Sequence, residues 1–124
     1  MIAPPPPPRW RVIIAGSRNV SAYASVQAAV KASGWTFTEV VSGTARGVDQ
    51  LGERYAAEHG LSVRQFPANW DAYGARAGRM RNSEMAHYAD ALIAVWDGRS
   101  PGTKHMIDVM RYHDKPTFVY RATA

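Results

Sequence analysis

Short apolar runs alternate along the chain with longer segments in which apolar residues recur at helical spacing. The short runs are rich in Val, Ile, Leu and aromatic residues, as is typical of parallel strands buried on both faces of a sheet. The predicted strands are residues 10–15, 39–42, 61–66, 91–96 and 116–120.

The longer segments predict four helices. Ser21 is expected to cap the first helix, which ends near Gly34, and the second runs from Gly47 to His59. The third and fourth helices are predicted at residues 79–88 and 103–113, and residues 67–78 form a longer connection. Strict alternation of this kind predicts an α/β fold: a doubly wound, Rossmann-like parallel sheet of order 3-2-1-4-5, with helices on both faces.

The length of 124 residues fits one domain, which we expect to span residues 9–121. Residues 1–8 contain five prolines and predict an extended arm, either a spacer or a ligand for a proline-binding module. The chain has no cysteine, no apolar run near the ~20 residues of a membrane span and no apolar signal core. We therefore expect a cytoplasmic protein that does not associate with membranes.

A formal net charge of +5 favours partners that carry phosphate, from a mononucleotide to DNA. The arginines are scattered over predicted loops and helices and form no continuous basic run. Charge alone therefore does not choose among these partners.

Three short loops with glycine, at residues 15–18, 42–47 and 100–103, each follow a predicted strand and lead into a predicted helix. Backbone N–H groups at the start of a helix are unpaired and carry partial positive charge, so an anion that approaches closely is bound there. With strand order 3-2-1-4-5, these loops converge at one edge of the sheet, beside the point where strand order reverses.

Several motifs in this order resemble the YspA-like group of the SLOG superfamily. They are Gly16-Ser17-Arg18, Val-Ser-Gly-Thr-Ala-Arg-Gly-Val-Asp at 41–49, Phe-Pro-Ala-Asn-Trp at 66–70, Arg-Asn-Ser-Glu-Met-Ala at 81–86, and Trp-Asp-Gly at 96–98 followed by Ser100 and Gly102-Thr103. The resemblance runs from about Arg11 to Val119. It implies a Rossmann-type protein that binds a nucleotide or a nucleotide-derived small molecule and that forms homo-oligomers. Relatives include the LOG phosphoribohydrolases and the DNA-processing protein DprA.

The motifs nominate a set of ligand-binding residues in which Gly102 and Thr103 hold a phosphate, Ser17, Gly43 and Thr44 contact phosphate or ribose, and Asp97 accepts ribose hydroxyls. The full set is Gly16, Ser17, Arg18, Ser42, Gly43, Thr44, Arg46, Asp49, Arg81, Asn82, Asp97, Gly98, Ser100, Gly102 and Thr103.

Each nomination has a structural alternative. Glycines at these junctions are also needed where the backbone has a positive φ or packs tightly, whether or not a ligand binds. Ser42 and Thr103 are suitable helix or turn caps. Asp49 in a first helical turn is favoured by the helix dipole whether or not a ligand binds. Arg79 flanks a turn with glycine and is a candidate to line the same crevice, although we expect it to face solvent. Trp70 is a candidate for a lid or a subunit contact.

The prediction of catalytic residues rests on a comparison with LOG enzymes, which use an Arg-Lys-x-x-Met helix and a Pro-Gly-Gly-x-Gly-Thr-x-x-Glu loop. Arg81 matches the functional arginine, but Met106 stands where the glutamate would be, and a thioether accepts no proton. The catalytic residues are therefore unknown, with Arg81, Glu84 and Asp97 as candidates. No cofactor is expected, and the four histidines lack metal-ligand spacing.

Three functional hypotheses follow. The leading one is a sensor or sequestering protein for a nucleotide derivative. The second is a nucleotide hydrolase that cleaves an N-glycosidic bond with altered residues. The third is a nucleic-acid binder like DprA, which the net charge favours but the lack of a basic stripe disfavours.

Overall fold

A computed structural model describes residues 9–123. The predicted proline-rich arm, residues 1–8, lies outside the described residues. Five strands form one sheet with the order β3-β2-β1-β4-β5, and every neighbouring pair is parallel. They are β1 (Arg11–Gly16), β2 (Glu39–Ser42), β3 (Ser62–Gln65), β4 (Ala91–Trp96) and β5 (Thr117–Arg121). The predicted doubly wound, Rossmann-like fold is confirmed.

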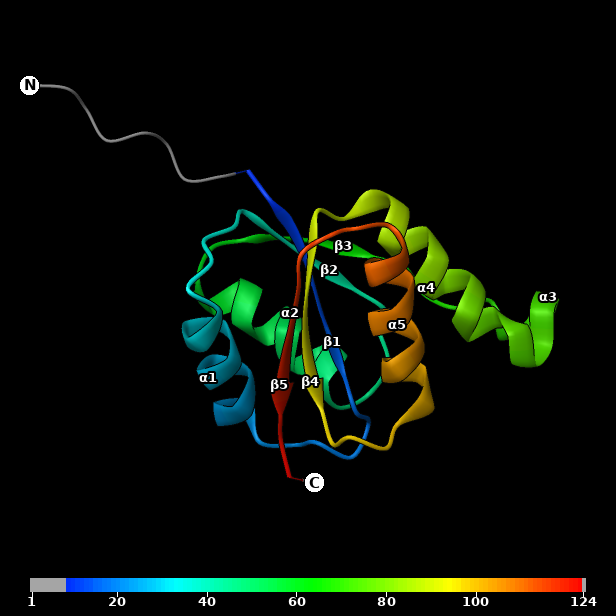
Figure 1. Cartoon of the computed structure of the whole chain (residues 1–124), viewed down its shortest axis with the longest axis horizontal. Coiled ribbons are helices and arrows are strands. Elements are labelled where there is room, and N and C mark those ends of the chain that lie inside the picture. The colour runs from blue at the N-terminus through cyan, green and yellow to red at the C-terminus, as the bar shows by residue number, and fades with distance from the viewer. Residues whose placement is uncertain (1–8, 124) are drawn as a thin grey trace, which may run out of the picture.

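Helices cover both faces of the sheet (Figure 1). They are α1 (Tyr23–Ser33), α2 (Val48–Glu58), α3 (Trp70–Tyr73), α4 (Ala77–Tyr88) and α5 (Pro101–Tyr112), with a 3-10 turn η1 (Gly74–Arg76). Val12 and Ile14 of β1 pack in one core cluster with α1 and α2, whereas Ile13 and Ala15 pack in another with α4 and α5. The alternation explains why β1 and β4 carry consecutive apolar residues, at 12–15 and 91–96.

Two local predictions are wrong. The N-cap of α1 is Ala22, not Ser21, and no side chain caps the helix. The amide of Ser25 bonds to the carbonyl of Ala22, so Ser21 lies one residue too early for its hydroxyl to reach the first turn. The segment predicted as a connection contains α3, whose Asn69 Oδ1 accepts a hydrogen bond from the amide of Ala72 at 3.1 Å.

The starts of the last two helices also differ from prediction. Helix α4 begins at Ala77 because η1 leads directly into it, and α5 begins at Pro101, two residues before the predicted start. A proline at the first helical position loses no hydrogen bond, since that amide has no partner in the helix. The earlier start puts Gly102 and Thr103 inside the first turn of α5.

The longest helices in residues 9–123 are α4 and α5, with 12 residues each, too short and too polar to cross a bilayer.

Gly16 allows β1 and β4 to meet closely at their carboxyl ends. Gly16 pairs with Val95, and the next amide, that of Ser17, bonds to the Val95 carbonyl at 3.1 Å. A Cβ at position 16 would lie 2.0 Å from that carbonyl oxygen, which belongs to the backbone of the central strand. A side chain at this position therefore requires the sheet itself to shift.

We predict that Gly16→Ala lowers the free energy of unfolding by about 3 kcal/mol or more, because overpacking against backbone is not relieved by a rotamer change. Gly102→Ala is the matched control, since a Cβ at position 102 meets nothing within 4 Å. Urea unfolding of both variants measures the difference. Equal stability of Gly16→Ala and the original chain would contradict the close approach.

Candidate functional site

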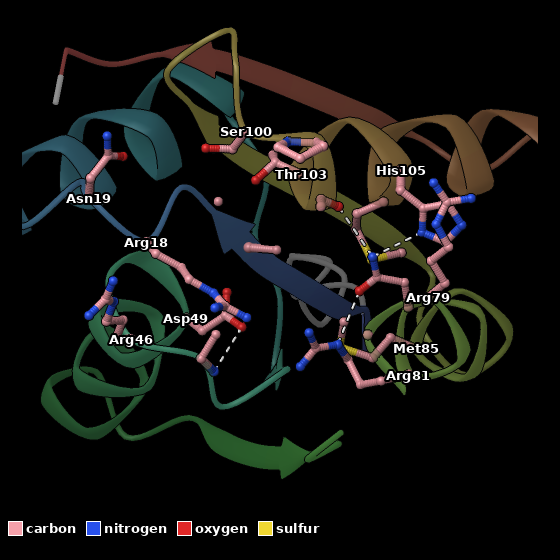
Figure 2. A pocket seen from close by; sticks show the side chains of 18 of the residues that line it. Arg18, Asn19, Arg46, Asp49, Arg79, Arg81, Met85, Ser100, Thr103 and His105 are labelled. Atoms are coloured by element: carbon pink, nitrogen blue, oxygen red, sulfur yellow. Dashed lines mark hydrogen bonds between the residues drawn. The ribbon is translucent and has the colours of Figure 1, made fainter. Parts of the chain in front are cut away.

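A cavity of about 530 Å³ opens beside the carboxyl ends of β1 and β4. The chain leaves β1 for α1 on one face of the sheet and leaves β4 for α5 on the other. This divergence creates the crevice in which doubly wound proteins bind ligands, and the volume falls in the usual range of small-molecule sites. Residues from the β1–α1 loop, the β2–α2 loop, α3, α4 and the start of α5 line it (Figure 2).

The cavity brings together many of the nominated residues. Gly16, Arg18, Arg46, Asp49, Arg81, Asn82, Ser100, Gly102 and Thr103 line it. Ser17, Ser42, Gly43, Thr44, Asp97 and Gly98 are not among the lining residues.

The polar groups of Ser17 and Asp97 are bonded within the protein and join the ends of β1 and β4. Ser17 Oγ accepts hydrogen bonds from the Asp97 amide and from Ser100 Oγ, both at 3.0 Å. Asp97 Oδ1 accepts the amides of Arg99 and Ser100 at 2.8 Å, which holds the pKa of this carboxyl well below its usual range. Asp97 therefore shapes the loop before α5.

Ser42 shapes the β2–α2 loop in a similar way. Its hydroxyl donates to Glu53 Oε2 at 2.6 Å and accepts from the amide of Thr44 at 3.1 Å. Thr44 has a φ of 65°, an unusual conformation for a β-branched residue, and this amide contact supports it. A Cβ at Gly43 would lie 2.7 Å from the Arg81 guanidinium and 2.8 Å from Asp49 Oδ2, so a side chain there would displace these two charged groups.

Asp49 and Arg81 face each other across this loop. Asp49 is buried, and its Oδ2 accepts the amide of Ala45 at 3.2 Å. Burial raises the pKa of Asp49 to about 6, while the Ala45 amide and the nearby Arg81 charge oppose the rise. Arg81 donates from Nη1 to the Gly43 carbonyl, and burial together with the positive charge of Arg18 lowers its pKa.

The first turn of α5 contributes a different kind of surface. The first amides of a helix have no carbonyl partner within it, and Gly102 and Thr103 occupy this turn. Position 102 has open space where a side chain would be, and its φ is not in the left-handed region. Packing and backbone conformation therefore do not explain this glycine, in contrast to Gly16.

Thr103 is 5% exposed and lines the cavity. Its hydroxyl makes none of the side-chain hydrogen bonds found in residues 9–123. No buried side-chain oxygen in these residues lacks a hydrogen-bond partner, so the Thr103 hydroxyl is not enclosed in the protein interior. The hydroxyl is consequently accessible from the cavity, toward which Figure 2 shows it directed. No hydrogen bond in the described part of the chain supports a capping role for the Thr103 side chain.

Other lining residues were not nominated from the sequence. Asn19 and His105 belong to this group, and Arg79, although exposed as expected, also lines the cavity. Trp70 is 49% exposed and contacts the cavity, with its ring near position 78 of α4. Helical spacing could have indicated His105, which lies three residues after Gly102, but only once α4 and α5 are known to face each other.

The catalytic candidates lie in different places. Arg81 lines the cavity, whereas Glu84 is exposed on α4 and is not a lining residue. Met106, at the position of the LOG glutamate, is buried in the cavity wall. Within residues 9–123, no three His, Cys, Asp or Glu side chains are grouped closely enough to hold a metal ion.

The structure is that of a Rossmann-like α/β protein with a cavity at the carboxyl ends of its strands. The profile of the YspA, cpYpsA-related SLOG family matches residues 10–73, from β1 to α3. Gene 61 protein of Mycobacterium phage D29 is 37% identical over 91 residues, which cover 62% of this chain and 73% of that protein. The chain belongs to the YspA, cpYpsA-related SLOG family.

We predict that Asp49 makes the free energy of unfolding fall as pH rises from about 4 to about 6. The folded pKa of about 6 lies above the ordinary 3.8, so the folded chain binds more protons than the unfolded chain in this window. The shift corresponds to about 3 kcal/mol at pH 7.5.

Asp49→Asn has no titrating carboxyl at this position and is expected to be the more stable protein at pH 7.5 but not at pH 4. Urea unfolding of both proteins at the two pH values measures this effect. A stability difference that does not change with pH would show that Asp49 titrates normally.

Proposed function

We propose that the protein binds a nucleotide or a nucleotide-derived small molecule in the cavity at the carboxyl ends of β1 and β4. The observation that carries the proposal is the open first turn of α5 in a cavity lined by four arginines and one aspartate. Membership of the SLOG family supports a nucleotide-related role. Binding itself, for sensing or sequestration, is the activity proposed.

The charges in the cavity favour an anionic ligand. Arg18, Arg46, Arg79 and Arg81 line it, and Asp49 is the acidic residue among the lining positions. Arg18 lowers the pKa of Arg81 by repulsion, so these cations are close enough to oppose one another. A bound phosphate relieves this repulsion and accepts hydrogen bonds from planar guanidinium groups.

The start of α5 is the best place for the phosphate. Its first-turn amides and the Thr103 hydroxyl are donors at the cavity wall, and the missing side chain of Gly102 leaves room for close approach. The half-exposed indole of Trp70 lies elsewhere on the same wall and offers an aromatic face for a base. This arrangement supports a ligand with both an anionic and a flat apolar part.

Hydrolysis is a second candidate, favoured by the position of Asp49. A buried carboxyl with a pKa of about 6 beside an arginine can exchange a proton near neutral pH. Incubation with AMP followed by chromatography separates the hypotheses, because hydrolysis of the N-glycosidic bond releases free adenine and binding does not.

We predict that at least one of AMP, GMP, ADP-ribose and cyclic AMP raises the thermal unfolding temperature. A ligand at 100 times its dissociation constant adds about 2.7 kcal/mol to the free energy of unfolding. Arg18→Ala and Thr103→Val are each expected to weaken binding of the stabilising nucleotide by roughly tenfold, since each deletes a donor to a charged oxygen.

Arg111→Ala is the matched control, because it removes the same charge from an exposed position in the last turn of α5, away from the cavity. It is expected to leave affinity within twofold of the original. A panel without any stabilising nucleotide would count against the proposal. Equal losses in Arg18→Ala and Arg111→Ala would indicate a diffuse charge effect, as for nucleic acid.

We also predict that Gly102→Ala weakens nucleotide binding by at least tenfold while the protein without ligand is as stable as before, or more so. The added methyl group meets nothing in the protein, and alanine favours a helix over glycine by about 1 kcal/mol. Thermal unfolding with and without the nucleotide measures both effects. Retained affinity in Gly102→Ala would exclude the start of α5 as the phosphate site.

A further inference from the structure

Three side chains on α4 and α5 form a continuous chain of hydrogen bonds at the cavity wall (Figure 2). Arg81 Nε donates to Asn82 Oδ1 at 3.1 Å. Asn82 Nδ2 lies 3.2 Å from the Gly102 carbonyl oxygen and 3.1 Å from His105 Nδ1. The chain therefore links the central arginine of the cavity to a histidine that sequence reasoning passed over.

The orientation of the Asn82 amide is determined by two of its partners, Arg81 and the carbonyl of Gly102. A guanidinium only donates, so the atom of Asn82 beside Arg81 is the amide oxygen. A backbone carbonyl only accepts, so the atom beside Gly102 is the amide nitrogen. Two independent partners thus give the same orientation of the Asn82 amide, which is buried at 7% exposure.

This orientation dictates the state of His105. The Asn82 nitrogen donates, so His105 Nδ1 accepts and carries no proton. In a neutral imidazole the proton is then on Nε2. A second proton on Nδ1 would place two N–H groups against each other at 3.1 Å, which opposes the charged imidazolium.

The surrounding charges act mainly in the same direction. Burial of the ring and the positive charge of Arg79 on α4 lower the pKa of His105, while Asp108 on α5 opposes them more weakly. Asn82 on α4 adds the hydrogen-bond constraint described above. On balance these groups lower the pKa of His105 and favour the neutral ring.

His105 Nε2 remains available for a ligand. None of the side-chain hydrogen bonds found in the described chain uses this atom, and no buried side-chain nitrogen there lacks a partner. Nε2 is consequently open to solvent, and His105 lines the cavity three residues after Gly102.

We propose that Arg81 and Asn82 hold His105 as a neutral donor, and that its Nε2–H recognises a hydrogen-bond acceptor of the ligand next to the phosphate site. The proposal rests on the proposed function, in that the cavity must hold a ligand for this donor to be used. Asn82 is a positioning residue and His105 a specificity-determining one. The favoured acceptor is an oxygen or an unprotonated ring nitrogen, whereas an ammonium or another pure donor is rejected.

The state of His105 is tested first, without a ligand. Long-range ¹H–¹⁵N NMR spectra of the full chain, assigned with His105→Gln, report which ring nitrogen carries the proton. The expected result is a proton on Nε2 at neutral pH and titration at a lower pH than for a solvent-exposed histidine. A proton on Nδ1, or an ordinary titration, would overturn the proposal.

Replacing Asn82 tests the positioning role. In Asn82→Asp the carboxylate still accepts from Arg81 but now also accepts from a protonated Nδ1, so the pKa of His105 is expected to rise above that of the original chain. Asn82→Ala, which has neither group, is expected to give an intermediate pKa. An unchanged titration in both folded variants would show that Asn82 does not control His105. The spectrum of the original chain remains decisive if either variant fails to fold.

Ligand use is tested with His105→Gln, which keeps an N–H near Nε2, and His105→Phe, which keeps a ring without a donor. Affinity for AMP is expected to stay within threefold in the first and to fall about tenfold in the second. Retained affinity in His105→Phe with a loss in His105→Gln would mean that ring shape alone matters. Equal losses in both variants would mean that the N–H donor makes no difference. Either result would overturn the recognition role. Parallel titrations with inorganic phosphate and with adenosine show whether the acceptor belongs to the phosphate or to the nucleoside.

If AMP, GMP, ADP-ribose and cyclic AMP all fail to bind the original chain while His105 shows the expected tautomer, the proposed function fails and the hydrogen-bonded chain stands. If AMP binds but His105 carries its proton on Nδ1, the proposed function stands and this inference fails.

Discussion

The structure depends on the close approach of β1 and β4 at their carboxyl ends. Gly16 permits it, because any side chain there would meet the Val95 carbonyl. From this contact the chain turns to opposite faces of the sheet, so the β1–α1 loop and the start of α5 diverge and leave a cavity beside the strand ends. The same contact brings the loops after β1, β2 and β4 to one edge, where the start of α5 meets the arginines.

Hydrogen bonding within the protein divides the polar residues of this edge into two groups. Ser17, Ser42 and Asp97 are bonded to other protein groups and build the loops. The Thr103 hydroxyl is accessible from the cavity, and His105, which also lines it, keeps an Nε2 that is open to solvent. The second group, together with Arg18 and the first-turn amides of α5, keeps donors that a ligand could use, whereas the first group is engaged in building the loops.

The sheet order and most element positions could be predicted, because buried parallel strands are apolar on both faces and glycine or proline marks their ends. The convergence of Gly16, Arg46 and Gly102 followed from that order. The role of His105 could not be predicted, since it depends on how α4 packs against α5. Helix α3 was missed because it has four residues, too few for a periodic pattern.

The central claim is that a nucleotide binds at the edge where these loops meet. Amide chemical-shift mapping of the full chain during titration with AMP and with ADP-ribose tests it most directly. The account predicts saturable shifts at Gly102, Thr103 and the loop around Arg18, with the amides of β3 and α1 unchanged. Shifts centred on β3 or α1, or no shifts with either nucleotide, would contradict it.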